Sequence, residues 1–315
     1  MPTQMNATIT QLGSLARTCP SPGQRGKVLA VFSKAIYLLT DVDELFWITT
    51  DTQPMHRRCA QISAPLPGLL AGSPFYVQDH RLTIDPDFVF HLGNASTWNV
   101  PHPDSVISVT DLPARIHSFF SSIDVSHAKG FGNFISQILS LSPGDFSDPL
   151  LRRAQPLVLD MASACLEHQP SRLPKIADRL IGLGAGLTPS GDDFLGGMFF
   201  ALHHLQAAYP DSDFADFHLP LESYRTRTHL ISYTLLNDLA HGYAVAPLHL
   251  LVNGLLMGEP FENIYLYVTQ LTSIGHSTGW DLLTGLLVGL LAADSHHYQE
   301  DCFVGKYALL AMTKA

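Results

Sequence analysis

A glycine-rich stretch at residues 182–197, GLGAGLTPSGDDFLGG, holds the groups best suited to chemistry. Glycine adopts positive φ angles without strain and lets a ligand come close to the backbone. The stretch then runs into the apolar pattern of a helix, whose free N–H groups and dipole favour an anion. We therefore predict an anion site built by Gly184, Gly186, Thr188, Ser190 and Gly191.

Two carboxylates follow in the first turn of the same expected helix. Ser190 is expected to cap the helix, with Asp193 three residues later in a capping-box arrangement. Asp192 and Asp193 would repel an anion, so the site needs a compensating cation or proton. The stretch lacks the lysine of a P-loop and the third glycine of a dinucleotide fingerprint. A tight turn between two helices is the alternative interpretation.

The pattern [S/T]-G-x-D-x-L-x-G occurs twice, at residues 190–197 and again at 278–285. In the second copy Thr278, Gly279 and Asp281 take the places of Ser190, Gly191 and Asp193. Each aspartate is expected at the third helical position, and the last glycine of each copy lets another backbone pass close by. We predict that the two helices cross and bring both aspartates to one cavity. Two unrelated capping boxes are the alternative.

Permanent cations are scarce around this stretch. Arg225 and Arg227 are the only Lys or Arg residues between Arg179 and Lys306. An arginine fork suits a carboxylate or phosphate, so we expect one of them to hold the ligand and the other to pair with Asp192 or Asp193. Salt bridges to the acidic loop nearby are the equally weighted alternative.

One histidine stands out from the others. His276 directly precedes the second copy of the pattern, where an imidazole could donate a proton to a leaving group or to an oxyanion. The remaining histidines show no spacing typical of a metal site. We therefore predict catalytic roles for His276, Asp193 and Asp281.

The periodicity of the chain changes near residue 110. Before it, β-branched and aromatic residues predict strands at 28–33, 35–39, 44–49, 75–78, 81–84 and 88–92, after a short helix or loop at 1–27. Beyond it, helices are predicted at 114–123, 134–141, 149–167, 174–181, 192–208, 223–239, 247–257, 261–273 and 278–293. We predict an α+β protein: a β-rich domain at 1–110, an antiparallel sheet or small barrel, and a helical domain at 111–315, with a linker at 99–104.

Composition excludes several classes of partner. Hydrophobic residues make up 46% and charged residues 15%, which is compatible with an apolar interface in a homo-oligomer. A net charge of −10 argues against nucleic acid. The four cysteines lack CxxC spacing, which argues against zinc and disulfides and favours the cytoplasm. The most apolar stretch, 282–293, is too short to span a membrane.

The assembled motifs resemble the AllH-type family, a former domain of unknown function found as a subunit of oxamate carbamoyltransferase in allantoin degradation. The resemblance rests on residues 182–193, 225–232 and 275–281 and on the strand pair near 28–39, and it covers about residues 24 to 293. It implies carbamoyl transfer between carbamoyl phosphate and oxamate, giving oxalurate and phosphate. It also implies partner subunits, one of them resembling succinyl-CoA synthetase.

Three functions are therefore weighed. The first is a carbamoyltransferase subunit, active on oxamate or a similar small amide or carboxylate, that holds phosphate at the glycine-rich helix N-terminus without a cofactor. The second is a non-catalytic interaction subunit of a hetero-oligomeric enzyme. The third is a Mg²⁺-dependent hydrolase that uses Asp192, Asp193 and Asp281 as oxygen ligands.

Overall fold

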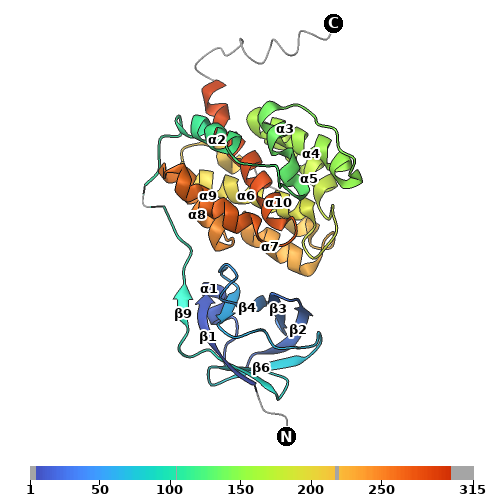
Figure 1. Ribbon diagram of the computed structural model, residues 1–315, viewed down its shortest axis with the longest axis vertical. Helices are drawn as coiled ribbons and strands as arrows, with labels where there is room; N and C mark the ends of the chain where they lie inside the picture. Colours follow the sequence, from blue (N-terminus) through green and yellow to red (C-terminus); the bar gives the residue numbers. More distant parts are fainter. Residues whose placement is uncertain (1–4, 104, 217–219, 299–315) are drawn as a thin grey trace. The chain divides into compact units, whose positions relative to one another are not determined.

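The computed structural model describes residues 5–103, 105–216 and 220–298 of the chain. Residue contacts divide them into two compact units. The first holds the residues up to His102 together with Tyr243–His249, and the second holds Pro103–Gly242 and the residues from Leu250 onward. Figure 1 shows that the first is mainly β and the second helical. The predicted α+β class, β-rich first and helical second, is confirmed.

The segment between the units attaches to the helical one. Our predicted linker covered 99–104, of which Asp104 lies outside the described residues. Further on, the Ile107 N–H donates to the Leu256 carbonyl at 2.8 Å, and the Tyr209 hydroxyl donates to the Ile107 carbonyl at 2.9 Å. Residue 107, which the sequence-based division places in the first domain, is thus hydrogen-bonded within the helical unit.

The N-terminal unit is a barrel. Its strands are β1 Met5–Gly13, β2 Arg25–Val31, β3 Ala35–Thr40, β4 Leu45–Thr50, β5 Cys59–Ile62, β6 Pro74–Gln78, β7 Arg81–Ile84, β8 Phe88–His91 and β9 Ser96–Trp98. Strands β1 to β8 close on themselves because β5 pairs with both β4 and β1, while β9 extends the sheet beside β1. Pairs β4–β5, β1–β8 and β1–β9 are parallel, and the other pairs are antiparallel. Of the two predicted forms, the barrel is the one found.

The first strand corrects our expectation for residues 1–27. From Met5 onward this range forms β1, the short helix α1 Ser14–Thr18 and the start of β2, and the residues before Met5 lie outside the described part. Polar and apolar residues alternate from Asn6 to Thr10, which is a strand pattern that our expectation did not take into account. Ala7 and Ile9 enter the barrel core. Pairing with β5, β8 and β9 decides the conformation.

The barrel interior is filled by aliphatic and aromatic side chains. Phe46, Phe75 and Phe90 are among its largest fully buried members.

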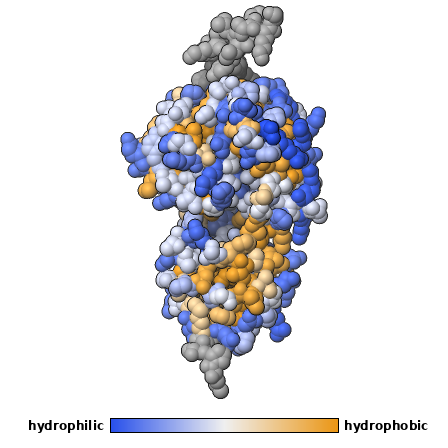
Figure 2. Space-filling model, turned by 45° about the vertical axis from the view of Figure 1, so that its right-hand side comes forward, coloured by the Kyte–Doolittle hydropathy of each residue, from blue (hydrophilic) through white to orange (hydrophobic). Residues whose placement is uncertain are grey.

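Figure 2 also shows apolar surface gathered on one face of this unit. The large apolar side chains that this unit exposes are Phe32, Val42, Leu70 and Tyr76.

The second unit is built of helices. The α-helices are α2 Leu112–Ser121, α3 Ile135–Ser140, α4 Pro149–Leu166, α5 Leu173–Leu180, α6 Ser190–Ala208, α7 Leu230–Ala240, α8 Ala246–Met257, α9 Phe261–Thr272 and α10 Thr278–Leu290. Short 3-10 helices are η1 Gly130–Phe134, η2 Pro170–Arg172, η3 Asp213–Asp216, η4 Leu221–Tyr224 and η5 Leu291–Tyr298. Across the described residues, no helix has the length and apolar character needed to cross a bilayer.

The predicted helix at 223–239 is wrong in its first part. The chain forms η4, then a turn through Arg225 and Arg227, and α7 begins only at Leu230. His229, the residue before α7, is extended, with φ −71° and ψ 150°. The Thr228 hydroxyl donates to Asp192, and this distant contact holds the turn outside the helical pattern.

Helices α6 and α10 cross at glycines, as predicted, and lie side by side in Figure 1. A Cβ added at Gly285 would come 1.9 Å from the Phe194 carbonyl oxygen, and one added at Gly197 would come 2.2 Å from that of Leu282. Only glycine permits this approach without a shift of backbone. The crossing lies near the start of both helices, so their N-termini lie close to each other.

Candidate functional site

The N-termini of α6 and α10 meet. The Thr188 and Thr278 hydroxyl oxygens are 3.2 Å apart, and the charge of Asp281 acts on Asp193. The two copies of the repeated pattern also sit in equivalent surroundings. A Cβ at Gly191 would lie 1.9 Å from the carbonyl oxygen of Leu180, at the end of α5, and a Cβ at Gly279 would lie 1.9 Å from that of Leu271, near the end of α9. The two helix N-termini meet as predicted, and a common cavity for both aspartates stays a prediction.

The capping differs from our expectation by one residue. Ser190 and Thr278 are the first helical residues rather than the caps, which are Pro189 and Ser277, and neither cap makes a side-chain hydrogen bond to its helix. Each aspartate is therefore the fourth residue of its helix. Gly191, predicted to bind an anion, is buried, and its N–H donates to the Leu183 carbonyl at 2.8 Å.

Asp193 is buried, with 5% of its surface exposed. Its Oδ2 accepts a hydrogen bond from the Thr188 hydroxyl at 2.9 Å. Burial raises the pKa of Asp193 well above its usual range, and the charges of Asp281 and Asp192 raise it further, whereas the Thr188 and Thr278 hydroxyls lower it. The carboxyl group is therefore costly to hold as a bare anion.

Asp281 is fully buried, with 0% exposed. Its Oδ1 accepts from the Phe131 N–H at 2.6 Å, in η1, where Gly130 at φ +52° passes close to the carboxylate. Burial raises the pKa of Asp281 to about 6, against the lowering effect of the Phe131 N–H and of the Ser277 and Ser190 hydroxyls. The other oxygen, Oδ2, has no hydrogen-bond partner among the described residues.

Asp192 joins two segments of the site. Its Oδ1 accepts from the Gly182 N–H at 2.6 Å, and its Oδ2 accepts from the Ser232 hydroxyl at 2.6 Å and from the Thr228 hydroxyl. The carboxylate thus ties the glycine turn to the turn before α7. Our expectation that an arginine pairs with Asp192 or Asp193 is wrong, because hydroxyl and backbone donors take that place.

The two arginines have different surroundings. Arg227 forms an ion pair with Asp178 at 2.7 Å, with 40% of its side chain exposed. Arg225 lies 3.5 Å from Glu222, with 52% of its side chain exposed. Both arginines thus form salt bridges, but to Asp178 in α5 and Glu222 in η4 rather than to the acidic loop, and Arg227 also lines the pocket described next.

An open pocket of about 270 Å³ lies beside the glycine turn. Its walls are Gly182, Gly184 and Pro189 on one side and residues 226–229 on the other. Pro189 is the N-cap of α6 and His229 that of α7. The first three N–H groups of α7 have no hydrogen-bond acceptor among the described residues. His229, which precedes these donors, and Arg227, whose guanidinium pairs with Asp178, both line the pocket, so a helix N-terminus and a cation lie at its edge.

The segment that forms this site matches a known family. Residues 180–290 match the family model of the oxamate carbamoyltransferase subunit AllH. The predicted resemblance is confirmed over these residues, which include every residue predicted for the site. Searches of curated proteins and of solved structures each gave no significant match.

Within the AllH-type segment, Gly184 and Arg227 are the predicted site residues that line the pocket. His276 is exposed and forms no hydrogen bond or ion pair with the described residues. Gly186 has φ +103°, and no atom lies within 4 Å of where its Cβ would be. Gly279 is buried against Leu271. The geometry therefore brings Thr188 and Thr278 together, and Gly184 packs beside Ser190.

Sequence reasoning missed other residues of the AllH-type segment. Thr226, Thr228 and His229 line the pocket, and Ser232 supports Asp192. All four residues lie in the family-like stretch 225–232, which was the available signal. Phe131, outside the segment, gave no signal, because its contribution is a backbone N–H.

The hydrolase alternative requires the three aspartates to form one metal site. Over the described part of the chain, no group of three or more His, Cys, Asp or Glu side chains is arranged to hold a metal ion. Both carboxylate oxygens of Asp192 instead accept hydrogen bonds from protein groups, three in all. A role for Mg²⁺ stays a prediction.

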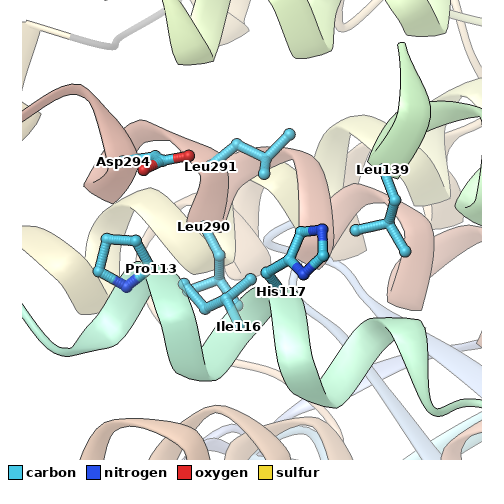
Figure 3. Close-up of a pocket in the computed structure, with 7 residues that line it drawn as sticks. All are labelled: Pro113, Ile116, His117, Leu139, Leu290, Leu291 and Asp294. Carbon is cyan, nitrogen blue, oxygen red and sulfur yellow. The ribbon is translucent and has the colours of Figure 1, made fainter. Parts of the chain in front are cut away.

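A second cavity lies elsewhere in the helical unit, between α2, α3 and the stretch after α10. Figure 3 shows mostly apolar side chains around it, with His117 and Asp294 as its polar members. Its volume is about 30 Å³, enough for a water molecule or two but not for a substrate. We assign no ligand to it.

Proposed function

We propose that the chain is a carbamoyltransferase subunit whose pocket beside the glycine turn binds the phosphate group of carbamoyl phosphate. One observation carries the proposal: Arg227 and His229, the residue that precedes the free N–H groups of α7, line the same pocket. A helix N-terminus with a planar guanidinium suits a phosphate. The AllH-type match supports the reaction class, because that family is described as a subunit of oxamate carbamoyltransferase.

The chemistry asks mainly for positioning and charge stabilisation. The amide nitrogen of oxamate, or of a similar small acceptor, attacks the carbamoyl carbon and loses a proton. The bond between that carbon and the phosphate oxygen breaks, and phosphate leaves with the electron pair. Negative charge grows on the leaving group, where Arg227 and the α7 N-terminus stabilise it. His229, at the pocket wall, is the lining imidazole that can take the proton.

Proton-transfer roles for His276, Asp193 and Asp281 stay predictions. None of the three lines the pocket, and the two aspartates are buried. The proposal therefore rests on Arg227 and α7 rather than on the carboxyl pair. Partner subunits, one resembling succinyl-CoA synthetase, belong to the proposal because the family resemblance implies them.

The test is reconstitution of the chain with the subunits that co-purify with it. Phosphate-dependent conversion of oxalurate to carbamoyl phosphate and oxamate should require this chain. Arg227→Ala should lower the rate about ten- to a hundred-fold, which corresponds to the loss of a charge-assisted hydrogen bond worth about 1.5–3 kcal/mol. If the complex needs the chain but Arg227→Ala and His229→Ala are fully active, the chain is a non-catalytic interaction subunit instead.

A further inference from the structure

The buried pair of Asp193 and Asp281 is separate from the phosphate pocket. Each aspartate belongs to a different helix, and 5% and 0% of their surfaces are exposed. A hydroxyl from the first residue of the opposite helix acts on each one: Thr278 on Asp193, and Ser190 on Asp281. The arrangement is reciprocal and follows from the crossing of α6 and α10.

One carboxylate oxygen of the pair lacks a hydrogen-bond partner, which indicates a ligand. Asp281 Oδ1 is satisfied by the Phe131 N–H, but Oδ2 is buried and has no hydrogen-bond partner among the described residues. A buried carboxylate oxygen without a partner is destabilising. A proton on Asp193 does not relieve it in this arrangement, because no hydrogen bond joins Oδ2 to Asp193.

The charges around the pair do not balance. Neither aspartate forms an ion pair with a described Lys, Arg or His. Asp192 lies near enough for its charge to act on Asp193. Each helix N-terminus supplies only about half an elementary positive charge, so two of them offset about one carboxylate. At least one positive charge is missing when both aspartates are ionised.

We propose that the Asp193–Asp281 pair binds one alkali-metal cation, Na⁺ or K⁺. The surrounding groups are hard oxygen ligands, namely the hydroxyls of Thr188, Ser190, Ser277 and Thr278. Mg²⁺ keeps several waters in octahedral geometry, and Ca²⁺ takes six to eight oxygens, so both suit a wetter or more acidic site. Two carboxyl groups with neutral hydroxyls, in a buried place, match a monovalent ion better.

Solvent reaches the edge of this site. Thr188 and Thr278 are only half-buried, and the Thr188 hydroxyl donates to Asp193 at 2.9 Å. The ion would hold α6 and α10 together at their N-termini, since it binds one carboxylate from each. This role goes beyond carbamoyl transfer and does not depend on it.

The test is thermal unfolding of the full chain at neutral pH in NaCl, KCl or tetramethylammonium chloride of equal ionic strength. One alkali cation should raise the midpoint in a saturable way. At a concentration about tenfold above its Kd, the ratio of folded to unfolded protein should rise about elevenfold. Asp281→Asn should remove this dependence. Asp160→Asn, at an exposed residue paired with Arg172, should keep it.

Sodium-23 NMR of the wild-type chain gives a readout that does not need a variant. Broadening of the sodium line that K⁺ reverses, and that Thr188→Val weakens, supports the site. Equal unfolding midpoints in all three chlorides, with no broadening of the sodium line, would overturn the proposal. The pair would then hold a proton instead of a metal cation. Stabilisation by Mg²⁺ or Ca²⁺ alone would overturn the choice of a monovalent ion.

Discussion

The hydroxyl oxygens of Thr188 and Thr278 lie 3.2 Å apart, although 90 residues separate them in the chain. Each belongs to a copy of the same structural unit: a helix, a turn, and a second helix with a glycine packed on the carbonyl of the first. Gly191 packs on Leu180 in one copy and Gly279 on Leu271 in the other. The repeated unit explains why the two helix N-termini meet.

We predict that Arg227→Ala weakens phosphate or carbamoyl phosphate binding about ten- to a hundred-fold, because Arg227 is the permanently charged cation among the residues that line the pocket. Calorimetric titration measures it, with thermal unfolding as the folding control. Arg225→Ala is the matched control, since that side chain pairs with Glu222 and does not line the pocket. Equal affinity in both variants would place the anion elsewhere.

Asp192→Ala should damage both stability and binding. The change leaves the Gly182 N–H and the Thr228 and Ser232 hydroxyls without their acceptor. We expect a loss of about 2–5 kcal/mol in the free energy of unfolding and a fall in phosphate affinity, because the two pocket walls lose their common contact. Met161→Ala, a core change in α4, should cost similar stability but no affinity. Equal affinities in the two variants would argue against this role of Asp192.

Gly285→Ala should destabilise the helical unit by about 1–3 kcal/mol or more, because the added methyl group meets the Phe194 carbonyl oxygen at 1.9 Å. Denaturant unfolding monitored by circular dichroism measures the change. Gly68→Ala is the control, since no atom lies within 4 Å of its added Cβ. A neutral Gly285→Ala would contradict the close crossing of α6 and α10.

Thr188→Val and Thr278→Val should be coupled. Each substitution removes one hydroxyl of the pair that acts on Asp193. A double-mutant cycle on the free energy of unfolding should give a coupling of about 0.5–3 kcal/mol. Additive effects would mean that the two hydroxyls do not act together.

Much of the architecture follows from local pattern. Short β-branched runs predicted most barrel strands, and the 3.6-residue period predicted α4, α6, α8, α9 and α10 to within about two residues of each N-terminus. Strand β1 was not predicted, because its polar/apolar alternation is short, from Asn6 to Thr10, and three pairing partners extend it. The turn before α7 was not predicted, because Thr228 is held by Asp192, 36 residues away.

By itself the sequence determined that two equivalent glycine-and-aspartate patterns start helices and that the glycines allow those helices to cross. These properties depend on neighbours within about one helical turn. Only the tertiary structure decided that Arg227 rather than Arg225 reaches the pocket, that hydroxyls rather than arginines meet Asp192, and that Asp281 accepts from a backbone N–H 150 residues away. The partner of a charged group is set by which distant segments pack beside it, and local spacing carries no record of that.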